Sequence, residues 1–291
     1  MHDLLRQSTG RAGGLRGWRL AFALPSLLVG GCSTADLVNA LVPQGGFRLT
    51  ADQPYGPLPR QRLDVYRPAT GAGPWPVVVF FYGGNWQGGA KADYLFVGEA
   101  LASRGFIAVI ADYRVYPETR YPGFLRDAAA AVVWTMAHLD ELGGDPGRIH
   151  LMGHSAGAYI AAMLALDARW LGDARARIKS TVGLAGPYDF LPLTDPILQL
   201  IFATESDLDR TQPIHFASGN AAPLYLASGR ADLTVRPGNA TRLAARIRAQ
   251  GGAATERYYT ALGHASLVGA LAAPLRFLGP VLDDVVGFLS E

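Results

Sequence analysis

The stretch "RIHLMGHSAGAYIAAMLALDA", residues 148–168, decides how the rest of the chain is interpreted. Its beginning, 148–152, predicts a short buried strand, and the alanine-rich 156–168 predicts a helix. Between them stands Gly153-His154-Ser155-Ala156-Gly157, which has the form G-x-S-x-G. A strand, a sharp turn and a helix in this order place one serine at the carboxyl edge of a sheet.

The two glycines of this motif have a steric role. A serine on a sharp strand-to-helix turn has strained backbone angles, and side chains two residues away on either side would clash. The turn lifts the Ser155 hydroxyl above the sheet, where the start of the helix presents free backbone N–H groups. The motif alone occurs by chance in many sequences, but in this context it predicts a nucleophilic serine.

A nucleophilic serine needs a general base and a carboxylate that orients the base. After a serine on such a turn, an Asp or Glu comes next along the chain and a His comes last. Two histidines follow Ser155, namely His215 and His264. His264 follows a strand expected to end at residue 260, so we predict it as the base. His215 lies in an irregular segment, and we interpret it as a surface or packing residue.

Asp232 is the predicted orienting carboxylate. It comes just after the apolar strand expected at 223–228, which places it at the same sheet edge as the serine. Asp189 and Asp195 are the competing acids. They follow an earlier strand, and a helix-capping or turn role suits them better.

Strands and helices alternate along the rest of the chain. Nearly continuous apolar strands between helices predict an α/β fold with a mostly parallel, eight-stranded sheet covered on both faces. The expected strands are 47–55, 60–66, 76–81, 106–113, 148–152, 180–185, 223–228 and 255–260. The expected helices are 123–139, 156–168, 239–249 and two near the C-terminus. Residues 187–220 fit this rhythm poorly and are predicted to be a small cap or lid-like insertion.

From about residue 63 to the C-terminus the chain resembles esterases of the α/β-hydrolase family. The resemblance is greatest to the branch with hormone-sensitive-lipase-related carboxylesterases, feruloyl-esterase-like domains and isoprenylcysteine methylesterases. It is carried by YGGNW at 82–86, DYR at 112–114, GGDPGRI at 143–149, GHSAG at 153–157, GRADLTV at 229–235 and GHAS at 263–266. The resemblance implies the α/β-hydrolase fold and the catalytic triad Ser155, Asp232 and His264.

The glycine-rich stretch "FFYGGNWQGG", residues 80–89, then has a function. Backbone N–H groups can converge on the negative oxygen of a tetrahedral intermediate only where no side chain blocks the approach, and each donor contributes about 3–4 kcal/mol. By resemblance, the oxyanion hole is formed at Gly83, Gly84 and Asn85, together with Ala156.

Two aromatic residues of this stretch, Trp86 and Tyr82, are predicted to shape the substrate pocket. Tyr82 stands where the family usually has histidine, a residue that generally supports the loop, so its hydroxyl is expected to form hydrogen bonds. Residues 112–114 are expected to anchor a strand end and its loop.

The predicted chemistry is cleavage of small or medium carboxylic esters through an acyl-enzyme intermediate. An amidase or peptidase, such as an arylformamidase-like enzyme, is the alternative, because it would use the same machinery. A catalytically silent envelope binding protein is less favoured, since it would need neither triad nor oxyanion loop. No cofactor and no metal are expected, because H-E-x-x-H, cysteine-cluster and nucleotide-loop motifs are all missing from the sequence.

Residues 1–31 resemble a bacterial lipoprotein signal peptide. A basic stretch precedes an apolar run at 20–29, which is too short to span a bilayer about 30 Å thick. The run ends in Val29-Gly30-Gly31-Cys32, which resembles the lipobox whose cysteine becomes the lipid-modified first residue. Cys32 is the only cysteine of the 291 residues, so no intrachain disulfide can form.

These features predict an envelope protein that is lipid-anchored through Cys32 at the periplasmic face of the outer membrane. A secreted or soluble periplasmic protein is the alternative. Residues 32–46 are expected to be a linker and 47–291 the hydrolase domain. Without residues 1–31 the chain has 22 Lys and Arg against 23 Asp and Glu, which gives no reason to expect a nucleic-acid partner.

Overall fold

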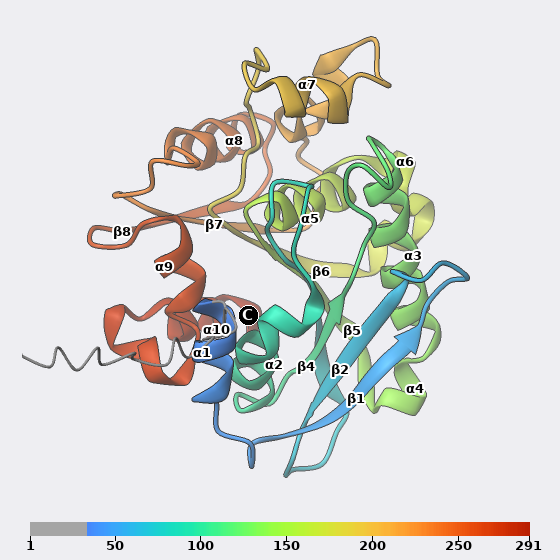
Figure 1. Ribbon diagram of the computed structural model, residues 1–291, viewed down its shortest axis with the longest axis vertical. Coiled ribbons are helices and arrows are strands. Elements are labelled where there is room, and N and C mark those ends of the chain that lie inside the picture. Colours follow the sequence, from blue (N-terminus) through green and yellow to red (C-terminus); the bar gives the residue numbers. More distant parts are fainter. Residues whose placement is uncertain (1–33) are drawn as a thin grey trace, which may run out of the picture. The chain divides into compact units, whose positions relative to one another are not determined.

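The structure is a computed structural model that describes residues 34–291 (Figure 1). The signal peptide and the lipidation site predicted for residues 1–32 lie outside the described residues. The described residues form one compact unit. Its strands are β1 (Phe47–Pro54), β2 (Arg62–Pro68), β3 (Trp75–Phe81), β4 (Ile107–Ala111), β5 (Gly144–His154), β6 (Ile178–Leu184), β7 (Leu224–Gly229) and β8 (Ala254–Tyr259).

The α-helices are α1 (Thr34–Ala40), α2 (Leu95–Ala102), α3 (Gly123–Ala137), α4 (Leu139–Leu142), α5 (Ala156–Leu166), α6 (Ala168–Leu171), α7 (Pro196–Phe202), α8 (Gly238–Ala249), α9 (His264–Gly269) and α10 (Val281–Leu289). Short 3₁₀ helices are η1 (Lys91–Tyr94), η2 (Gly172–Arg177), η3 (Leu208–Thr211), η4 (Pro213–Phe216) and η5 (Ala273–Leu278). Within the described part, no helix is long and apolar enough to span a membrane.

All eight strands form one sheet in the order β1-β2-β4-β3-β5-β6-β7-β8. The β1–β2 and β2–β4 pairs are antiparallel, and every pair from β4 to β8 is parallel. Parallel strands put their carboxyl ends at one edge, which is where α/β folds build their sites. The predicted eight-stranded, mostly parallel sheet is therefore confirmed.

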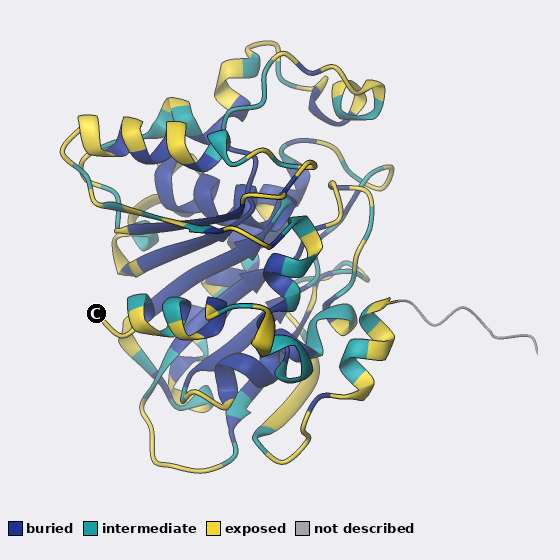
Figure 2. Cartoon of the chain, turned by 90° about the vertical axis from the view of Figure 1, so that its left-hand side faces the viewer, coloured by how far each residue is buried: buried dark blue, intermediate teal, exposed yellow. Residues whose placement is uncertain are grey.

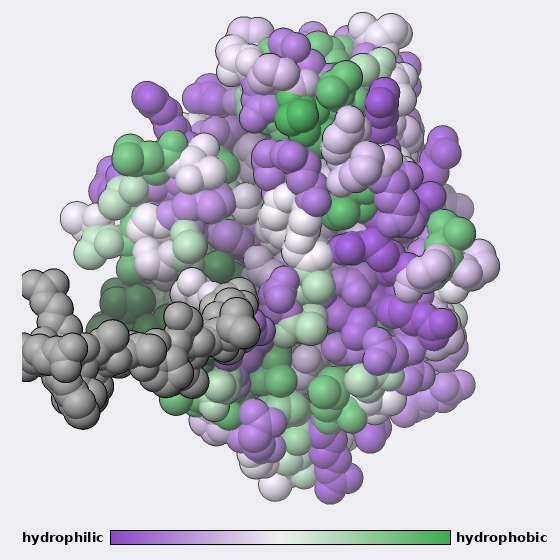
Figure 3. Space-filling view, viewed as in Figure 1, coloured by the Kyte–Doolittle hydropathy of each residue, from purple (hydrophilic) through white to green (hydrophobic). Residues whose placement is uncertain are grey.

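Helices cover both faces of this sheet. Helices α3, α5 and α8 lie on one face, and α2 and α10 lie on the other (Figures 1 and 2). Every residue of α5 is buried, as expected for a helix that is apolar all round and packed between the sheet and other helices. The edge strand β1 is mostly exposed, and Figure 3 shows a largely hydrophilic surface over β1 and β2, which protects an unpaired sheet edge from aggregation.

The structure adds elements that the hydrophobic pattern did not indicate. Helix α1 lies inside the expected linker 32–46, and helix α2 follows the glycine-rich loop. The insertion expected at 187–220 contains α7, η3 and η4. His264 is the first residue of the short helix α9, which the sequence pattern did not indicate by its residues. Helices of seven or eight residues, such as α1 and α2, are too short for a helical period to show in the sequence.

Candidate active site

Ser155 occupies the sharp turn between β5 and α5. Its backbone has φ +55° and ψ −122°, a strained conformation for a residue with a side chain. The Ser155 N–H donates to the Leu184 carbonyl at 2.9 Å, which fixes the turn to β6. A Cβ at Gly157 would lie 1.9 Å from the Phe81 carbonyl oxygen, so only glycine lets α5 start this close to the end of β3. The turn therefore holds the serine hydroxyl above the sheet edge.

The structure brings the three predicted triad residues into line. The His264 Nε2 atom lies 2.9 Å from Ser155 Oγ, and His264 Nδ1 lies 2.8 Å from Asp232 Oδ2. They follow β5, β7 and β8, so three strand ends supply one residue each. In this arrangement the imidazole can take the serine proton while the carboxylate holds the ring and stabilises its cation.

Backbone donors hold the Asp232 carboxylate. Its Oδ1 accepts from the N–H groups of Thr234 at 2.9 Å and Val235 at 2.8 Å. The Asp232 side chain is completely buried, whereas 19% of the His264 side chain is exposed. The carboxylate is thus shielded, and the imidazole edge stays open to a substrate.

The competing residues lie elsewhere. Asp195 caps α7 by accepting from the N–H of Ile197, which confirms its predicted capping role. Asp189 instead forms an ion pair with Arg242 of α8. His215 is about half exposed beside Asp209 and has no part in the triad, as predicted.

The predicted oxyanion loop faces the same cavity as the triad. Gly83, Gly84, Asn85 and Ala156 all line the cavity that Ser155 and His264 open into. The loop turns sharply, since Gly84 has φ +138° and Asn85 has φ +53°. A Cβ at Gly84 would lie 2.2 Å from the Gly88 carbonyl oxygen, so this position requires glycine. The backbone can therefore approach a bound carbonyl closely, although which amides hold the oxyanion stays a prediction.

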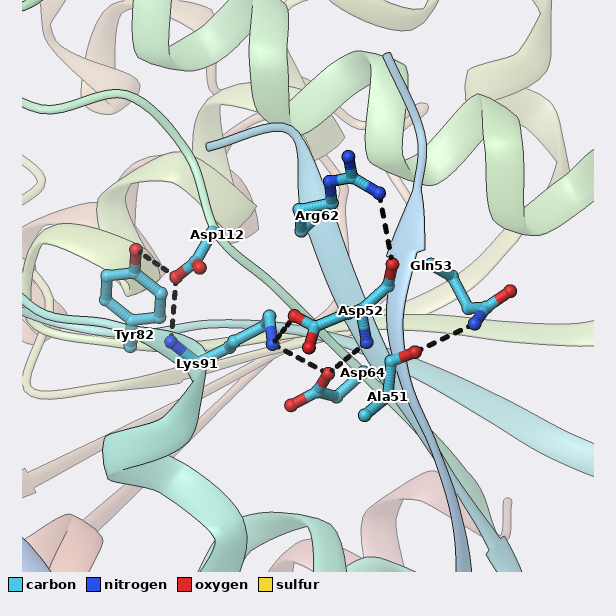
Figure 4. A network of polar contacts seen from close by, with 8 residues as sticks. All are labelled: Ala51, Asp52, Gln53, Arg62, Asp64, Tyr82, Lys91 and Asp112. Atoms are coloured by element: carbon cyan, nitrogen blue, oxygen red, sulfur yellow. Dashed lines mark hydrogen bonds and ion pairs between the residues drawn. The ribbon is translucent and has the colours of Figure 1, made fainter. Parts of the chain in front are cut away.

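Tyr82 corrects one sequence prediction, because it is not among the residues that line this cavity. Its side chain is fully buried beneath the loop, with the ring stacked on Tyr113 at 4.7 Å between ring centroids. Its hydroxyl donates to Asp112 Oδ1 at 2.8 Å (Figure 4) and accepts from Arg60 Nη2 at 2.9 Å. Tyr82 therefore supports the loop through hydrogen bonds, as expected for that position, and does not form the pocket. Trp86 does line it.

Asp112 and Arg60 fix both ends of this loop. Asp112 Oδ1 also accepts from the N–H of Lys91 at 2.7 Å (Figure 4), and Arg60 Nη2 donates to the carbonyl of Gly89 at 2.7 Å. Burial raises the pKa of Asp112, while the donors around it act in the opposite direction. The D-Y-R segment at 112–114 indicated an anchoring role, but no sequence signal pointed to Arg60.

The Lys91 side chain extends the network outward. Its Nζ contacts Asp52 Oδ1 at 2.7 Å and Asp64 Oδ1 at 2.8 Å (Figure 4). Asp52 and Asp64 belong to β1 and β2, so the end of the oxyanion loop is tied to the antiparallel edge of the sheet.

His154 is a functional neighbour that the sequence did not indicate, since it fills the variable position of the motif. Its Nε2 lies 3.1 Å from the His264 carbonyl oxygen. Because a carbonyl only accepts, this nitrogen carries the proton. Burial lowers the pKa of His154 to about 3, and His264 nearby adds to the effect, so the ring is neutral at neutral pH. His154 therefore fixes the backbone of the predicted base without adding a charge.

The cavity has a volume of about 1250 Å³, more than the 300–1,000 Å³ typical of ligand pockets. The insertion at 187–220 supplies Pro187, Phe190, Asp195 and Leu198 to its wall. In the part of the chain that the structure describes, no group of three or more His, Cys, Asp or Glu side chains could hold a metal ion.

The sheet order, the helices on both faces and the Ser155–His264–Asp232 line define an α/β-hydrolase with the geometry of a serine hydrolase. Comparison with known proteins gives the family. The chain belongs to the BD-FAE family, whose sequence pattern matches residues 63–247.

Individual relatives agree with this assignment. The chain is 30% identical to isoprenylcysteine alpha-carbonyl methylesterase ICME of Arabidopsis thaliana, over 81% of this chain and 60% of the relative. It is 31% identical to kynurenine formamidase of Danio rerio, over 74% of this chain and 69% of the relative. The chain spans between 31% and 60% of the length of the plant methylesterases it matches. The structure of the carboxylesterase EstE1, cloned from a metagenomic library, has a TM-score of 0.73 at 21% identity, covering 88% of this chain and 94% of that one, and shows the same fold.

Proposed function

We propose that this protein is a carboxylesterase-type serine hydrolase that cleaves small or medium carboxylic esters. The observation that carries the proposal is the hydrogen-bonded line from Ser155 through His264 to Asp232, beside the cavity that the glycine loop, Ser155 and His264 line together. The family and the named activities of the matched relatives support it.

The proposed reaction has two halves. His264 takes the proton of Ser155 as Oγ attacks the ester carbonyl carbon, and the amides of Gly84, Asn85 and Ala156 receive the developing oxyanion. His264 then gives its proton to the departing alcohol, which leaves an acyl group on the serine. In the second half, a water molecule attacks the acyl carbon while His264 takes a proton from it. The bond between the acyl carbon and Ser155 Oγ then breaks, the carboxylic acid leaves, and His264 returns the proton to Oγ.

An amidase acting on formamides or anilides is the second candidate. The chain's similarity to a kynurenine formamidase favours it specifically. Acyl transfer from an amide needs the same nucleophile and base, and differs in that the leaving nitrogen must be protonated. A silent binding protein has less support, because it would need no aligned triad.

Ser155→Ala tests the nucleophile. The wild type should react with a fluorophosphonate probe and hydrolyse p-nitrophenyl acetate or butyrate faster than the matching anilides and an aryl formamide. Ser155→Ala should lose both labelling and ester cleavage while keeping the wild-type melting temperature. Labelling of the folded variant would overturn the nucleophile, and a preference for the formamide would establish the amidase alternative.

The proposed location is the periplasmic face of the outer membrane, through lipids on Cys32. One acyl chain anchors a protein only marginally and two or more anchor it stably, which fits the diacylated or triacylated cysteine of bacterial lipoproteins. Ser33 next to Cys32 is not the aspartate that retains many lipoproteins in the inner membrane.

Cys32→Ala tests the anchor in cells. The wild type should fractionate with membranes, need detergent for release and incorporate labelled palmitate, whereas Cys32→Ala should do none of these. Lipid-free release of both forms would favour a secreted or soluble periplasmic enzyme.

A further inference from the structure

Helix α1 forms part of the wall of the catalytic cavity. Thr34, Ala35 and Val38 line the same cavity as Ser155 and His264. These three residues, called the α1 wall below, precede the segment 63–247 that the family pattern covers. The family assignment therefore says nothing about the α1 wall, and its role has to be argued from its contacts.

One residue, Asn39, fastens α1 to the body of the molecule with both ends of its amide. Asn39 Nδ2 donates to the Ala92 carbonyl at 2.9 Å, and its Oδ1 accepts from the N–H of Phe96 at 3.1 Å. These partners belong to η1 and α2, and Figure 1 shows α1 beside α2. Val38 packs against the hydrophobic core next to them. Helix α1 is thus held in one place by specific hydrogen bonds.

The elements around α1 add apolar side chains to the cavity. They are Tyr94 of η1, Phe96 of α2, Val268 of α9, and Leu275 and Leu278 of η5. Among the described lining residues, the single charged one from these elements is Asp93, whose carboxylate accepts from the N–H of Ala90 at 2.9 Å.

The part of the cavity wall formed near α7 and α8, which lie away from α1 (Figure 1), contains charged residues. The insertion, α8 and the loop before it supply Asp195, Arg236, Asn239 and Arg242 alongside apolar residues such as Phe190. An apolar group bound there would lie beside charged side chains that need water, whereas the side next to α1 exposes mainly hydrocarbon. The two sides of the cavity therefore suit different parts of one substrate.

We infer that the α1 wall binds an apolar chain of the substrate ester and so determines which chain lengths the enzyme prefers. This inference rests on the proposed esterase function. Each methylene removed from water between the α1 wall and its neighbours strengthens binding about fourfold. Esters with a medium chain are then favoured over acetates for as long as the cavity has room next to α1.

Val38→Trp tests the inference by filling this space. The measurement is kcat/KM of the full-length, detergent-solubilised protein on two series: p-nitrophenyl esters with acyl chains of two to twelve carbons, and acetates of alcohols of the same lengths. Val38→Trp should lower the ratio of the eight-carbon to the two-carbon kcat/KM at least tenfold in one of the two series, and Leu37→Trp should leave that ratio unchanged. Leu37→Trp is the matched control, because Leu37 lies on the same helix, is 61% exposed and is not among the residues lining the cavity.

Asn39→Ala is a second test, which loosens α1 and does not fill the space beside it. Loss of both amide hydrogen bonds should raise KM for the eight-carbon ester severalfold without changing kcat for the two-carbon ester. If Val38→Trp does not fold, Ala35→Leu takes its place and the same ratio decides. A wild type that cleaves no ester in either series overturns the proposed function. A wild type that cleaves esters, while Val38→Trp keeps the wild-type ratio in both series, overturns this inference alone.

Discussion

Tyr82 joins two charged residues beneath the oxyanion loop, because its hydroxyl donates to Asp112 and accepts from Arg60. The loop is attached to the same pair again at Gly89 and Lys91. Four contacts thus fix a loop whose glycines give it little stiffness of its own. At the scale of single residues, the geometry of the proposed oxyanion hole depends on side chains that do not line the cavity.

Tyr82→Phe should reduce kcat about 10- to 100-fold with little change in KM. The substitution keeps the ring but removes hydrogen bonds to charged partners, each worth about 1.5–3 kcal/mol, so the loop donors lose their alignment in the transition state. Steady-state kinetics on a short p-nitrophenyl ester measure the effect.

Tyr159→Phe is the matched control, because the Tyr159 hydroxyl is also buried but has no hydrogen-bond partner among residues 34–291. Tyr82→His, which restores the residue usual in the family, should keep more activity than Tyr82→Phe. Equal kcat in Tyr82→Phe and wild type would show that Arg60 and Asp112 hold the loop without the phenol.

At the scale of elements, the start of α5 is pressed against the end of β3. Gly157 stands at this contact, with backbone atoms of Phe81 and Tyr82 where a Cβ would be. The contact brings the turn of Ser155 beside the loop that follows β3. Gly157 therefore allows the close approach of Ser155 to the loop that is proposed to supply the oxyanion donors.

Gly157→Ala should destabilise the fold by about 1–3 kcal/mol, because the added methyl meets backbone that cannot move aside. Gly287→Ala is the control in another helix, α10, where no neighbouring atom of the described chain lies within 4 Å of the added Cβ. It should stabilise the protein by about 0.5–1 kcal/mol. Urea denaturation measures the free energy of unfolding of both variants. A Gly157→Ala variant more stable than the wild type would contradict the close contact.

The positions of the triad residues could be predicted from the sequence, because they depend on where strands end and on their order along the chain. Ser155, Asp232 and His264 each follow a strand of the parallel sheet, so their convergence at one edge could be expected. The direction of the Tyr82 ring could not, because the local pattern does not say whether a residue after a strand turns toward the cavity or beneath the loop. The place of α1 depends on Asn39 reaching residues more than fifty positions away, a contact that no local pattern contains.

At the scale of the whole molecule, buried histidines make the fold sensitive to acid. His150 lies on β5 with its Nδ1 atom 2.8 Å from Ser180 Oγ, and burial lowers its pKa from 6.5 to about 4. Between these pH values the unfolded chain binds a proton at this residue and the folded chain does not. Stability is therefore lost as the pH falls from 6.5 to 4, by up to about 1.4 kcal/mol per pH unit.

His150→Gln should flatten this dependence. Glutamine does not titrate, so the slope of the unfolding free energy between pH 6.5 and pH 4 should fall by up to about 1.4 kcal/mol per pH unit. Urea unfolding at pH 7, 6 and 5 measures it. His154, whose pKa is lowered further, leaves part of the slope in place. Parallel curves for variant and wild type would show that His150 takes up no proton on unfolding.

The spread of the triad over three strands has a consequence for heat inactivation. Ser155 follows a strand paired on both sides, whereas His264 follows β8, which among the strands of the described residues pairs only with β7. Edge elements open with less free energy than the centre of a sheet. Fraying of β8 would move His264 away from Ser155 while Ser155 is still in place. We therefore expect enzymatic activity to be lost at a lower temperature than the midpoint of unfolding measured by circular dichroism. Loss of activity on heating would then report the local unfolding of β8 before the rest of the sheet unfolds.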